Sequence, residues 1–361
     1  MADRREARLA ALRTALAALG VDGALLTCLP NIRYLTGFSG SNALVAVTAS
    51  RILLITDFRY QTQVKEEVGD FAQVIIELQS VWSALWRHLP AMGATTMAFE
   101  SAHLAHREFA RLLQQGDKWM WRPATDLVET LRERKDADEI AAIERAAAAA
   151  TGALARTLPQ VKAGLTELQI AGILEREMRE GGSEGYAFET IVASGERSAL
   201  PHARAARRAV RAGEFLLFDF GAVVDGYVSD VTRTVVVGRA TAEQRAFYDV
   251  VREANARAAA GVRGGMPARD ADGLARSYIE GAGFGELFGH GLGHGIGLEV
   301  HEAPRLARTA EGTLAPGAVV TIEPGLYRPG WGGVRIEDDV VLDPAGPRIL
   351  TDFPRELVEL A

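Results

Sequence analysis

The sequence predicts an α/β domain followed by an α+β domain, and three observations support this prediction. The chain has 361 residues, more than one typical domain contains. Helical and strand patterns alternate over about the first 130 residues. A charged segment then leads into an alanine-rich helix pattern, and carboxylate-bearing hairpins follow. We therefore place the two domains at residues 1–130 and 131–361.

Charge and composition limit the function classes. The formal net charge is −7 and the isoelectric point is near 5.6, which argues against a general nucleic-acid binder. No stretch approaches the roughly 20 apolar residues of a membrane helix, and the amino-terminal segment lacks the apolar run of a secretory signal. The single cysteine, Cys28, has no internal disulfide partner. We expect a cytoplasmic protein that binds neither nucleic acid nor membrane.

The first domain has the elements of an α/β fold. Residues 1–20 form an amphipathic helix pattern, and "GALLTCLP", "NALVAVTA" and "RILLIT" are typical of buried strands. "ALWRHL" and "REFARLLQQ" have the spacing of helical faces. There is no Gly-rich phosphate loop, and we expect no metal-ligand cluster here. We assign His88, His103 and His106 to surface helices, with solvated or capping roles.

The second domain opens with two predicted helices. The segment "LRERKDADEIAAIERAAAAATGALARTLPQV" is charged at its start and alanine-rich afterwards. This pattern predicts an exposed linker near residue 130 that continues into a long helix. The segment "TELQIAGILEREMREGG" predicts a second helix, and its final Gly pair can form the C-cap. The strands that follow carry the chemistry.

The first of two carboxylate hairpins has an Asp-Gly turn at residues 225–226, between "EFLLFDFGAVV" and "YVSDVTRTVVV". If these two residues form the loop, Asp219 lies opposite Thr232. Asp230 then lies opposite Gly221. Because strand residues share a face with every second neighbour, all four lie on one face, with the two carboxylates about 7–8 Å apart at Cα. We expect Gly221 to leave room for a metal or substrate near the backbone.

The second hairpin repeats this arrangement. "AVVTIEPGLY" and "GGVRIEDDVVL" flank the turn "RPGW". A turn centred near Gly330 places Glu323 opposite Glu337. Arg335 then shares their face and could orient a ligand carboxylate.

Five side chains can therefore converge on a pair of metal ions. They are Asp219, Asp230, His294, Glu323 and Glu337. Four carboxylates on apolar strands would repel one another and resist burial unless cations lay between them. The competing interpretation is two solvated sheet faces. Mainly carboxylate ligands favour Mn²⁺, with Co²⁺ or Zn²⁺ as alternatives.

The histidines lie near these segments. His290 and His294 have HxxxH spacing, but the glycines between them argue against a helix, and no glutamate follows His290 as in HExxH. In an extended segment both histidines lie on one face. His301 follows at a turn, and His202 lies in "SALPHARAARR".

The ordered set of His202, "DFGAVVDGYVSDVTRT", "HGLGHGIGLEVHE", "TIEPG" and "GGVRIED" resembles the pita-bread metallopeptidases. This group includes methionine aminopeptidase, aminopeptidase P and prolidase. The resemblance covers the chain from about residue 135 onward. "NIRYLTGFSGSNALV" and "LLITDFRYQTQ" resemble the creatinase-type N-terminal domain of the proline-specific branch. The resemblance implies a creatinase-type α/β domain, an α+β pita-bread catalytic domain and hydrolysis of Xaa-Pro bonds.

The resemblance also implies metal-binding roles. Asp219 would bind one metal ion through both oxygens. Asp230 and Glu337 would bridge two ions. His294 and Glu323 would complete the other site.

Further roles concern the substrate. By the resemblance, His202, His290 and His301 match the family's substrate-side histidines, and Arg335 matches its second-shell arginine. We expect Glu323 to take a proton from the attacking water and hand it to the proline nitrogen. His290 or His301 would stabilise the developing oxyanion.

The expected function is that of an Xaa-Pro dipeptidase acting on proline-containing dipeptides. The alternative is an aminopeptidase P that accepts longer peptides; a methionine aminopeptidase and a non-catalytic peptide-binding module are less favoured. A dipeptide-restricted site needs a partner for the terminal carboxylate, for which Arg204, Arg207 and Arg208 are candidates. The loop Asn31–Ser41, from a partner subunit, could block longer peptides. We expect a homodimer, the commonest oligomer.

Overall fold

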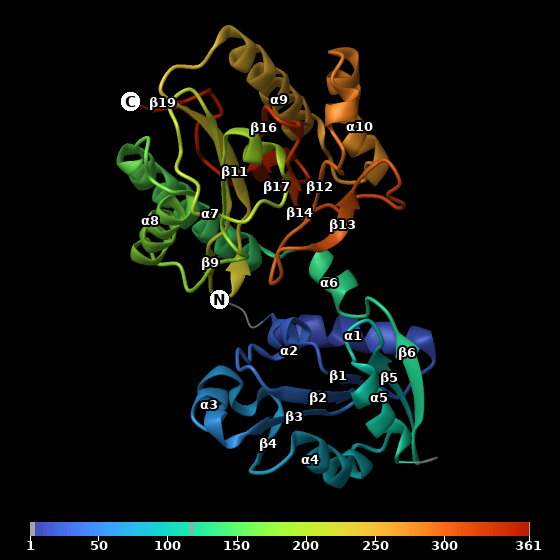
Figure 1. Cartoon of the computed structure of the whole chain (residues 1–361). Helices are drawn as coiled ribbons and strands as arrows, with labels where there is room; N and C mark the ends of the chain where they lie inside the picture. The colour runs from blue at the N-terminus through green and yellow to red at the C-terminus, as the bar shows by residue number, and fades with distance from the viewer. Residues whose placement is uncertain (1–3, 116–117, 361) are drawn as a thin grey trace. The chain divides into compact units, whose positions relative to one another are not determined.

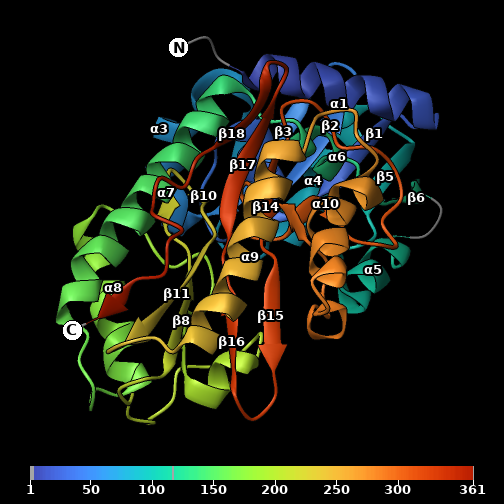
Figure 2. The same cartoon turned by 90° about the horizontal axis from the view of Figure 1, so that it is seen from above.

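The computed structural model describes residues 4–115 and 118–360. The chain divides into two compact units, residues 1–132 and 133–361. Within the described ranges, every helix is too short or too polar to traverse a bilayer. The structure confirms the predicted order of the two domains, an α/β unit followed by an α+β unit (Figures 1 and 2).

The first unit is built on one six-stranded sheet in the order β4-β3-β2-β1-β5-β6. Its strands are β1 (Gly23–Leu26), β2 (Ala43–Thr48), β3 (Ile52–Asp57), β4 (Gln73–Glu77), β5 (Thr96–Glu100) and β6 (Met120–Ala124). β1 pairs antiparallel with β2 and parallel with β5. The three predicted buried strands are confirmed as β1, β2 and β3, whose residues are nearly all buried.

Helices cover both faces of this sheet, which is why its central strands are continuously apolar. The helices are α1 (Arg5–Leu19), α2 (Leu29–Thr36), α3 (Gln63–Glu67), α4 (Val81–His88), α5 (His106–Leu113) and α6 (Glu129–Glu133). Figure 1 shows α1 and α2 on one face and α4 on the other. On the α4 face, Leu25, Leu44 and Leu53 pack with Trp82 in one apolar cluster.

Three sequence-based predictions for this unit were wrong. His103 lies in a turn between β5 and α5, because its ring pairs with Glu129 at 2.8 Å instead of facing solvent from a helix. Cys28, His103 and Glu129 form a potential metal-ligand cluster, although none was expected. The expected loop Asn31–Ser41 is helical through Thr36, since α2 occupies its first half.

The expected exposed linker near residue 130 was also wrong. Arg132 is buried and donates a hydrogen bond from Nη1 to Asn31 Oδ1 (2.7 Å). The Lys135 side chain is buried and its Nζ lies 3.0 Å from Glu302 Oε2. The charge of this segment is neutralised by tertiary partners that local composition does not reveal.

The second unit contains two main sheets flanked by four long helices (Figure 2). The helices are α7 (Ala137–Thr157), α8 (Glu167–Glu180), α9 (Ala242–Gly261) and α10 (Ala268–Gly281). Capping boxes at Asp136, Thr166 and Thr241 begin the first three of them. The predicted C-cap of the second helix is confirmed at Gly181.

One sheet has the order β19-β11-β8-β7 and the other β13-β12-β14-β17-β18, with two short hairpins beside them. The strands are β7 (Ile191–Ser194), β8 (Phe215–Phe220), β9 (Val223–Val224), β10 (Tyr227–Val228), β11 (Val231–Val237), β12 (Gly293–Gly295), β13 (Glu302–Leu306), β14 (Val319–Ile322), β15 (Gly325–Arg328), β16 (Gly332–Arg335), β17 (Asp338–Asp343), β18 (Gly346–Ile349) and β19 (Glu359–Leu360). Apolar residues of α7 and α8 pack on the first sheet, and those of α9 and α10 pack on the second.

The predicted registers of both hairpins are confirmed. Asp219 on β8 pairs with Thr232 on β11, as the Asp-Gly turn implies. In the second hairpin, Gly325 pairs with Arg335. The interpretation of Gly221 was wrong: a Cβ there would lie 2.0 Å from the Ser229 carbonyl oxygen, so the glycine admits a neighbouring backbone instead of a ligand.

Candidate metal centre

The acidic residues lie where the strand ladders open. β14 pairs with β17 up to Ile322 and Asp338, and the β15–β16 ladder resumes at Gly325 and Arg335 in the same register. Glu323 and Glu337 occupy the gap between these ladders. The backbone N–H and C=O groups of these two residues are therefore outside both ladders and can bond to other segments.

The gap is also where the two carboxylate hairpins meet. The backbone N–H of Glu337 donates to the Thr232 carbonyl at 3.0 Å, forming an isolated bridge between β11 and the start of β17. Because Thr232 pairs with Asp219, this single bridge brings the acids of both hairpins together.

These side chains open into a cavity of about 660 Å³. All nine predicted site residues line it, namely His202, Asp219, Asp230, His290, His294, His301, Glu323, Arg335 and Glu337. His202 is exposed at this lining, whereas Asp219, Asp230 and Glu337 are buried. The structure thus assembles in one place residues spread over more than a hundred positions of sequence.

The acids surround the imidazole of His294. Its Nε2 lies 3.4 Å from Glu323 Oε1 and 3.8 Å from Asp230 Oδ2. Potential ligand atoms of Asp230, His294 and Glu337 all lie within 4.8 Å of one another. Asp230 Oδ1 is buried and has no hydrogen-bond partner among the described residues. A buried carboxylate oxygen without a partner is costly, and this one faces the other acids.

Burial and mutual repulsion raise the pKa values of these carboxyl groups. For Asp230, burial and the charges of Glu337 and Asp219 raise the pKa well above its usual range. Burial, followed by repulsion from Glu323, does the same to the pKa of Glu337. The pKa of Glu323 rises to about 7, chiefly through burial, although Arg335 opposes the rise. At neutral pH the cluster therefore needs either protons or cations.

His294 has the protonation state of a metal ligand. Burial lowers its pKa to about 4, so the ring is neutral at pH 7. Its Nδ1 lies 3.1 Å from the Gly295 carbonyl oxygen, which can only accept, so the proton belongs on Nδ1. The other nitrogen, Nε2, then presents a lone pair to the acidic cluster. Carboxylate oxygens with one neutral imidazole suit a divalent cation, so the residues present fit such an ion.

The remaining histidines form a polar edge of the cavity. His290 Nδ1 donates to the Gly291 carbonyl (2.8 Å), and its Nε2 accepts from the Tyr327 hydroxyl (2.9 Å). Burial lowers the His290 pKa to about 4. The His301 ring lies 4.4 Å from that of His294, and burial lowers its pKa as well. Both rings are neutral at pH 7, and the two nitrogens of His290 are already engaged, one as a donor and one as an acceptor.

Arg335 and four polar residues to which the sequence analysis gave no role in the site support the ligands. Arg335 pairs with Asp219, and its Nε donates to Thr232 Oγ1 at 3.0 Å. Thr232 Oγ1 donates to Glu337 Oε2 at 2.5 Å. Thr321 Oγ1 donates to Glu323 Oε1 at 3.3 Å. Both threonines lie two positions from a candidate ligand. The two-residue strand period placed Thr232 on the ligand face in the sequence analysis, and the same period could have identified Thr321.

Asp339 and Tyr327 are the other two supports. Asp339 Oδ2 accepts from the backbone N–H of Asp230 at 3.0 Å and so orients that residue. The Tyr327 hydroxyl accepts from Arg335 Nη1 at 2.9 Å and donates to His290. Nothing in the local sequence pattern singles out either Tyr327 or Asp339.

The predicted arginine cluster separates in the structure. Arg208 pairs with Glu214 and donates to Ser194, away from the cavity lining. Arg207 is exposed and does not line the cavity either. Arg204 does line it, and its Nε lies 3.2 Å from Glu189 Oε2. Arg305, which the sequence analysis missed, also lines the cavity, because β13 pairs it directly with His294.

An acid-lined cavity between two sheets, with one neutral imidazole and buried supporting groups, defines a metal-dependent hydrolase site. Residues 141–344 match the model of metallopeptidase family M24, and residues 8–134 match the Creatinase/Prolidase N-terminal domain. The chain belongs to metallopeptidase family M24 and carries this N-terminal domain. The pita-bread fold predicted for the second domain is confirmed.

Several full-length relatives are similar to this chain. An Xaa-Pro dipeptidase of Pyrococcus horikoshii is 35% identical over 94% of this chain and 95% of its own length. The structure of an Xaa-Pro dipeptidase from Bacillus anthracis superposes with a TM-score of 0.95 at 38% identity, covering 99% and 100% of the two chains. An X-Pro aminopeptidase from Thermotoga maritima superposes at 0.90 with 36% identity, covering 97% and 99%.

Proposed function

We propose that this protein is an Xaa-Pro dipeptidase that hydrolyses proline-containing dipeptides with two divalent metal ions. The observation that carries the proposal is a group of four carboxylates that shares a cavity of about 660 Å³ with the unprotonated Nε2 of His294. Asp219, Asp230 and Glu337 are buried, and Glu323 is partly buried. The similarity to an Xaa-Pro dipeptidase along the whole chain supports the choice of substrate.

The candidate ligands are Asp219, Asp230, His294, Glu323 and Glu337. Their mainly hard oxygen donors favour Mn²⁺, and Co²⁺ or Zn²⁺ could replace it. Such ions, when bound, supply a water of lowered pKa and polarise a carbonyl group. The raised pKa values of Asp230 and Glu337 support this proposal, because cations would offset the repulsion that raises them.

The protein groups perform the proton transfers in the proposed reaction. Glu323 lines the cavity and is our candidate for accepting a proton from water and returning it to the leaving proline nitrogen. The neutral ring of His301 borders the cavity and can donate a hydrogen bond to the scissile carbonyl or its oxyanion. His290 also borders the cavity, but its one N–H is donated to Gly291, so it would stabilise the oxyanion only after exchanging that bond. His202, exposed at the lining, is placed to contact the substrate.

Specificity for dipeptides would require a cation for the terminal carboxylate. We propose Arg305 for this role, since its strand holds it beside His294 and it lines the cavity. Arg204 and Arg305 are both exposed, but Arg204 is less suitable because it already pairs with Glu189. Replacing Arg305 by Ala should raise KM for Ala-Pro by at least about tenfold, as loss of a charge-assisted hydrogen bond implies. Arg204→Ala is the matched control and should change KM less.

The alternative is an aminopeptidase P acting on longer peptides, which the similarity to an X-Pro aminopeptidase favours. One experiment separates the two. The protein is treated with a chelator, reloaded with Mn²⁺, and assayed on Ala-Pro, Ala-Pro-Gly and a longer Ala-Pro peptide, with Met-Ala-Ser as the test for a methionine aminopeptidase. A dipeptidase cleaves only Ala-Pro and only after reloading.

The other results have equally definite meanings. Comparable turnover of all three Ala-Pro peptides would establish the aminopeptidase. Full activity in protein shown to be free of metal would refute the metal-dependent mechanism. Failure of the reloaded protein to cleave any Ala-Pro peptide would exclude both activities and favour a peptide-binding module.

We also propose a homodimer in the cytoplasm. Cys28 is the only cysteine in the sequence, so the chain can form no internal disulfide, as a reducing compartment allows. Light scattering of the purified protein would test the dimer: a mass near 38.8 kDa would indicate a monomer.

A further inference from the structure

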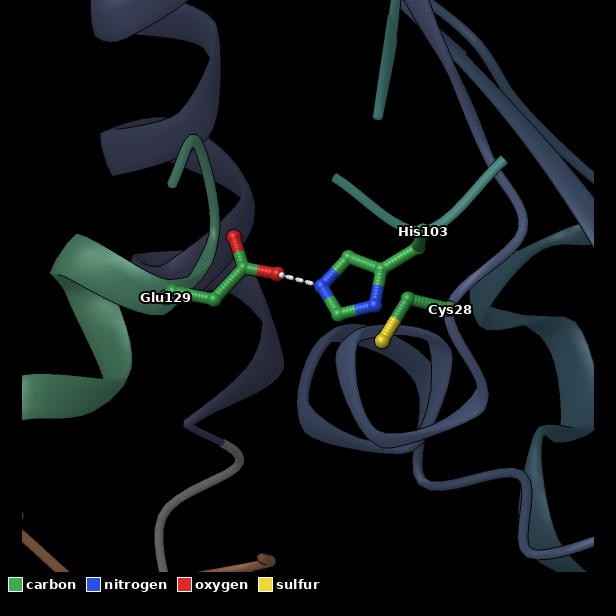
Figure 3. Close-up of side chains that lie close together, drawn as sticks. All are labelled: Cys28, His103 and Glu129. Carbon is green, nitrogen blue, oxygen red and sulfur yellow. Dashed lines mark hydrogen bonds and ion pairs between the residues drawn. The ribbon is translucent and has the colours of Figure 1, made fainter. Parts of the chain in front are cut away.

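A second group of potential metal ligands lies entirely within the first unit. It consists of Cys28, His103 and Glu129, whose donor atoms all lie within 4.8 Å of one another. Figure 3 shows the imidazole of His103 between the other two side chains, with one ring nitrogen toward Glu129 and the other toward the Cys28 sulfur. His103 Nε2 lies 2.8 Å from Glu129 Oε1.

The topology of the sheet brings these residues together. β1 and β5 are adjacent and parallel, so their carboxyl ends meet at one edge. Cys28 follows β1, and His103 lies in the turn that follows β5. Glu129 is the first residue of α6. Ligand sites of open sheets favour this edge, outside the carboxyl ends of parallel strands.

One buried network holds Cys28 and Glu129 in place. Glu100, at the end of β5, accepts from the backbone N–H of Cys28 at 2.8 Å. Asn31 Nδ2 donates to both Glu100 (2.7 Å) and Glu129 (2.6 Å). Asn31 Oδ1 accepts in turn from Arg132. Such outer contacts orient ligands before an ion binds, and they are typical of metal sites.

The three donors differ in type and exposure. The side chains of His103 and Glu129 are 34% and 19% exposed, whereas Cys28 is buried at the N-cap of α2. A sulfur, an imidazole nitrogen and a carboxylate oxygen are the three donor types that Zn²⁺ takes in proteins.

We propose that Cys28, His103 and Glu129 bind a thiolate-preferring divalent ion of the Zn²⁺ class, in a site separate from the candidate centre of the second unit. Thiolate, imidazole and carboxylate ligands suit Zn²⁺, whereas the oxygen-rich second-unit cluster suits harder ions. The ion would join the ends of two strands to the start of α6. The competing explanation is an ordinary His103–Glu129 ion pair beside a buried thiol.

The single cysteine allows a direct test in the full-length protein. Co²⁺, a spectroscopic substitute for Zn²⁺, gives a thiolate charge-transfer absorption only where sulfur is a ligand. Any such band therefore reports on Cys28, whatever ions the second unit binds. We expect a saturable band in the unmodified protein that Zn²⁺ abolishes by displacement and that Cys28→Ser lacks.

The variants test the other two ligands. His103→Gln and Glu129→Gln should each weaken the cobalt affinity of this band by at least about tenfold. His106→Gln, the same change at an exposed position on α5, is the matched control and should behave as the unmodified protein. His103 is partly exposed, so its variant should fold.

Two outcomes would overturn the proposal. One is the absence of any thiolate band at saturating Co²⁺. The other is a band that both glutamine variants leave unchanged, since the thiol alone would then bind the ion. Because the readout is independent of peptide hydrolysis, the result does not depend on the function proposed for the second unit.

Discussion

Glu337 and Asp338 are neighbours in sequence and both are buried, yet their surroundings differ completely. The Asp338 carboxylate accepts from Arg233 and Arg355, each at 2.7 Å, and from Thr351. Burial would raise the pKa of Asp338, but the two arginines hold it below its usual value. Glu337 faces other acids, and its pKa is well above the usual range. Adjacent strand residues point to opposite faces, which separates the two environments.

The comparison shows that burial of an acid does not by itself indicate a metal site. Asp338 is a structural anion whose cations are supplied by the chain. The Glu337 carboxylate lies 3.9 Å from the Nε of Arg335, which also pairs with Asp219, whereas Arg233 donates to the backbone carbonyl of Glu337 and pairs with Asp338. The candidate centre is distinguished by its excess of negative charge, and not by how deeply its acids are buried.

Replacing Glu337 by Gln should have the largest effect on activity. The change keeps the shape and removes a shared ligand, so we expect kcat/KM on Ala-Pro to fall by about 1000-fold or more, since bound ions contribute several kcal/mol. The metal-free protein should be no less stable, because a repelled carboxylate has been removed. Urea denaturation and metal content measure both parts. A variant with normal metal content and activity would contradict the assignment.

Asp338→Asn should show the opposite behaviour. It leaves two arginines without their counter-charge, Arg233 being buried, so the free energy of unfolding should fall by about 3–5 kcal/mol. The folded fraction should retain its metal and most of its activity. Urea denaturation gives the stability, and activity per folded molecule is measured at low temperature. If Asp338→Asn removed the metal without loss of stability, the comparison would fail.

The pH dependence of stability should differ between metal-free and metal-loaded protein. The pKa of Glu323 is raised from 4.5 to about 7 in the fold. Its protonated form therefore favours the metal-free fold below about pH 4.5, and this contribution, at most about 3 kcal/mol, is lost as the pH rises through 7.

Below about pH 6.5 the buried neutral rings of His290 and His294 oppose this slope, because both gain a proton on unfolding. The melting temperature of metal-free protein should therefore fall between about pH 6.5 and 8, where both rings are neutral in either state, while bound Mn²⁺ removes this dependence. Thermal melts of both forms at several pH values provide the measurement. Parallel pH profiles would contradict the raised pKa.

Thr232→Val should have a smaller effect. The hydroxyl donates to Glu337 and accepts from Arg335, so its loss should weaken metal affinity or activity by about 10–100-fold. Thr234→Val is the matched control, because the Thr234 hydroxyl contacts only the backbone of Arg335. Similar metal affinities in the two variants would show that Thr232 has no special role.

Much of the candidate site could be predicted because its main relationships are local. An Asp-Gly turn sets the pairing of Asp219 with Thr232, and the turn near Gly330 sets the register of the second hairpin. The alternation of strand side chains then gives the shared faces. The roles of Gly221 and Arg208 were misjudged although their partners, Ser229 and Glu214, lie nearby in sequence. The strand register predicts which residues pair, but not how closely two backbones approach or which charge a side chain meets.

Other features depend on contacts between distant segments. Arg305 reaches the cavity through the pairing of β13 with β12, and Lys135 is buried by Glu302. Cys28, His103 and Glu129 are far apart along the chain and meet because β1 lies beside β5. No periodicity within any one segment predicts these partners.

The amino-acid sequence alone determined the order of the two domains, the two carboxylate hairpins and their registers, since turn residues and side-chain alternation act over a few positions. The tertiary structure decided which acids repel and which are neutralised, because charge balance depends on arginines and backbone groups brought from elsewhere. It also decided that a sulfur, a nitrogen and an oxygen donor share one edge of the first sheet, since only strand order places them there.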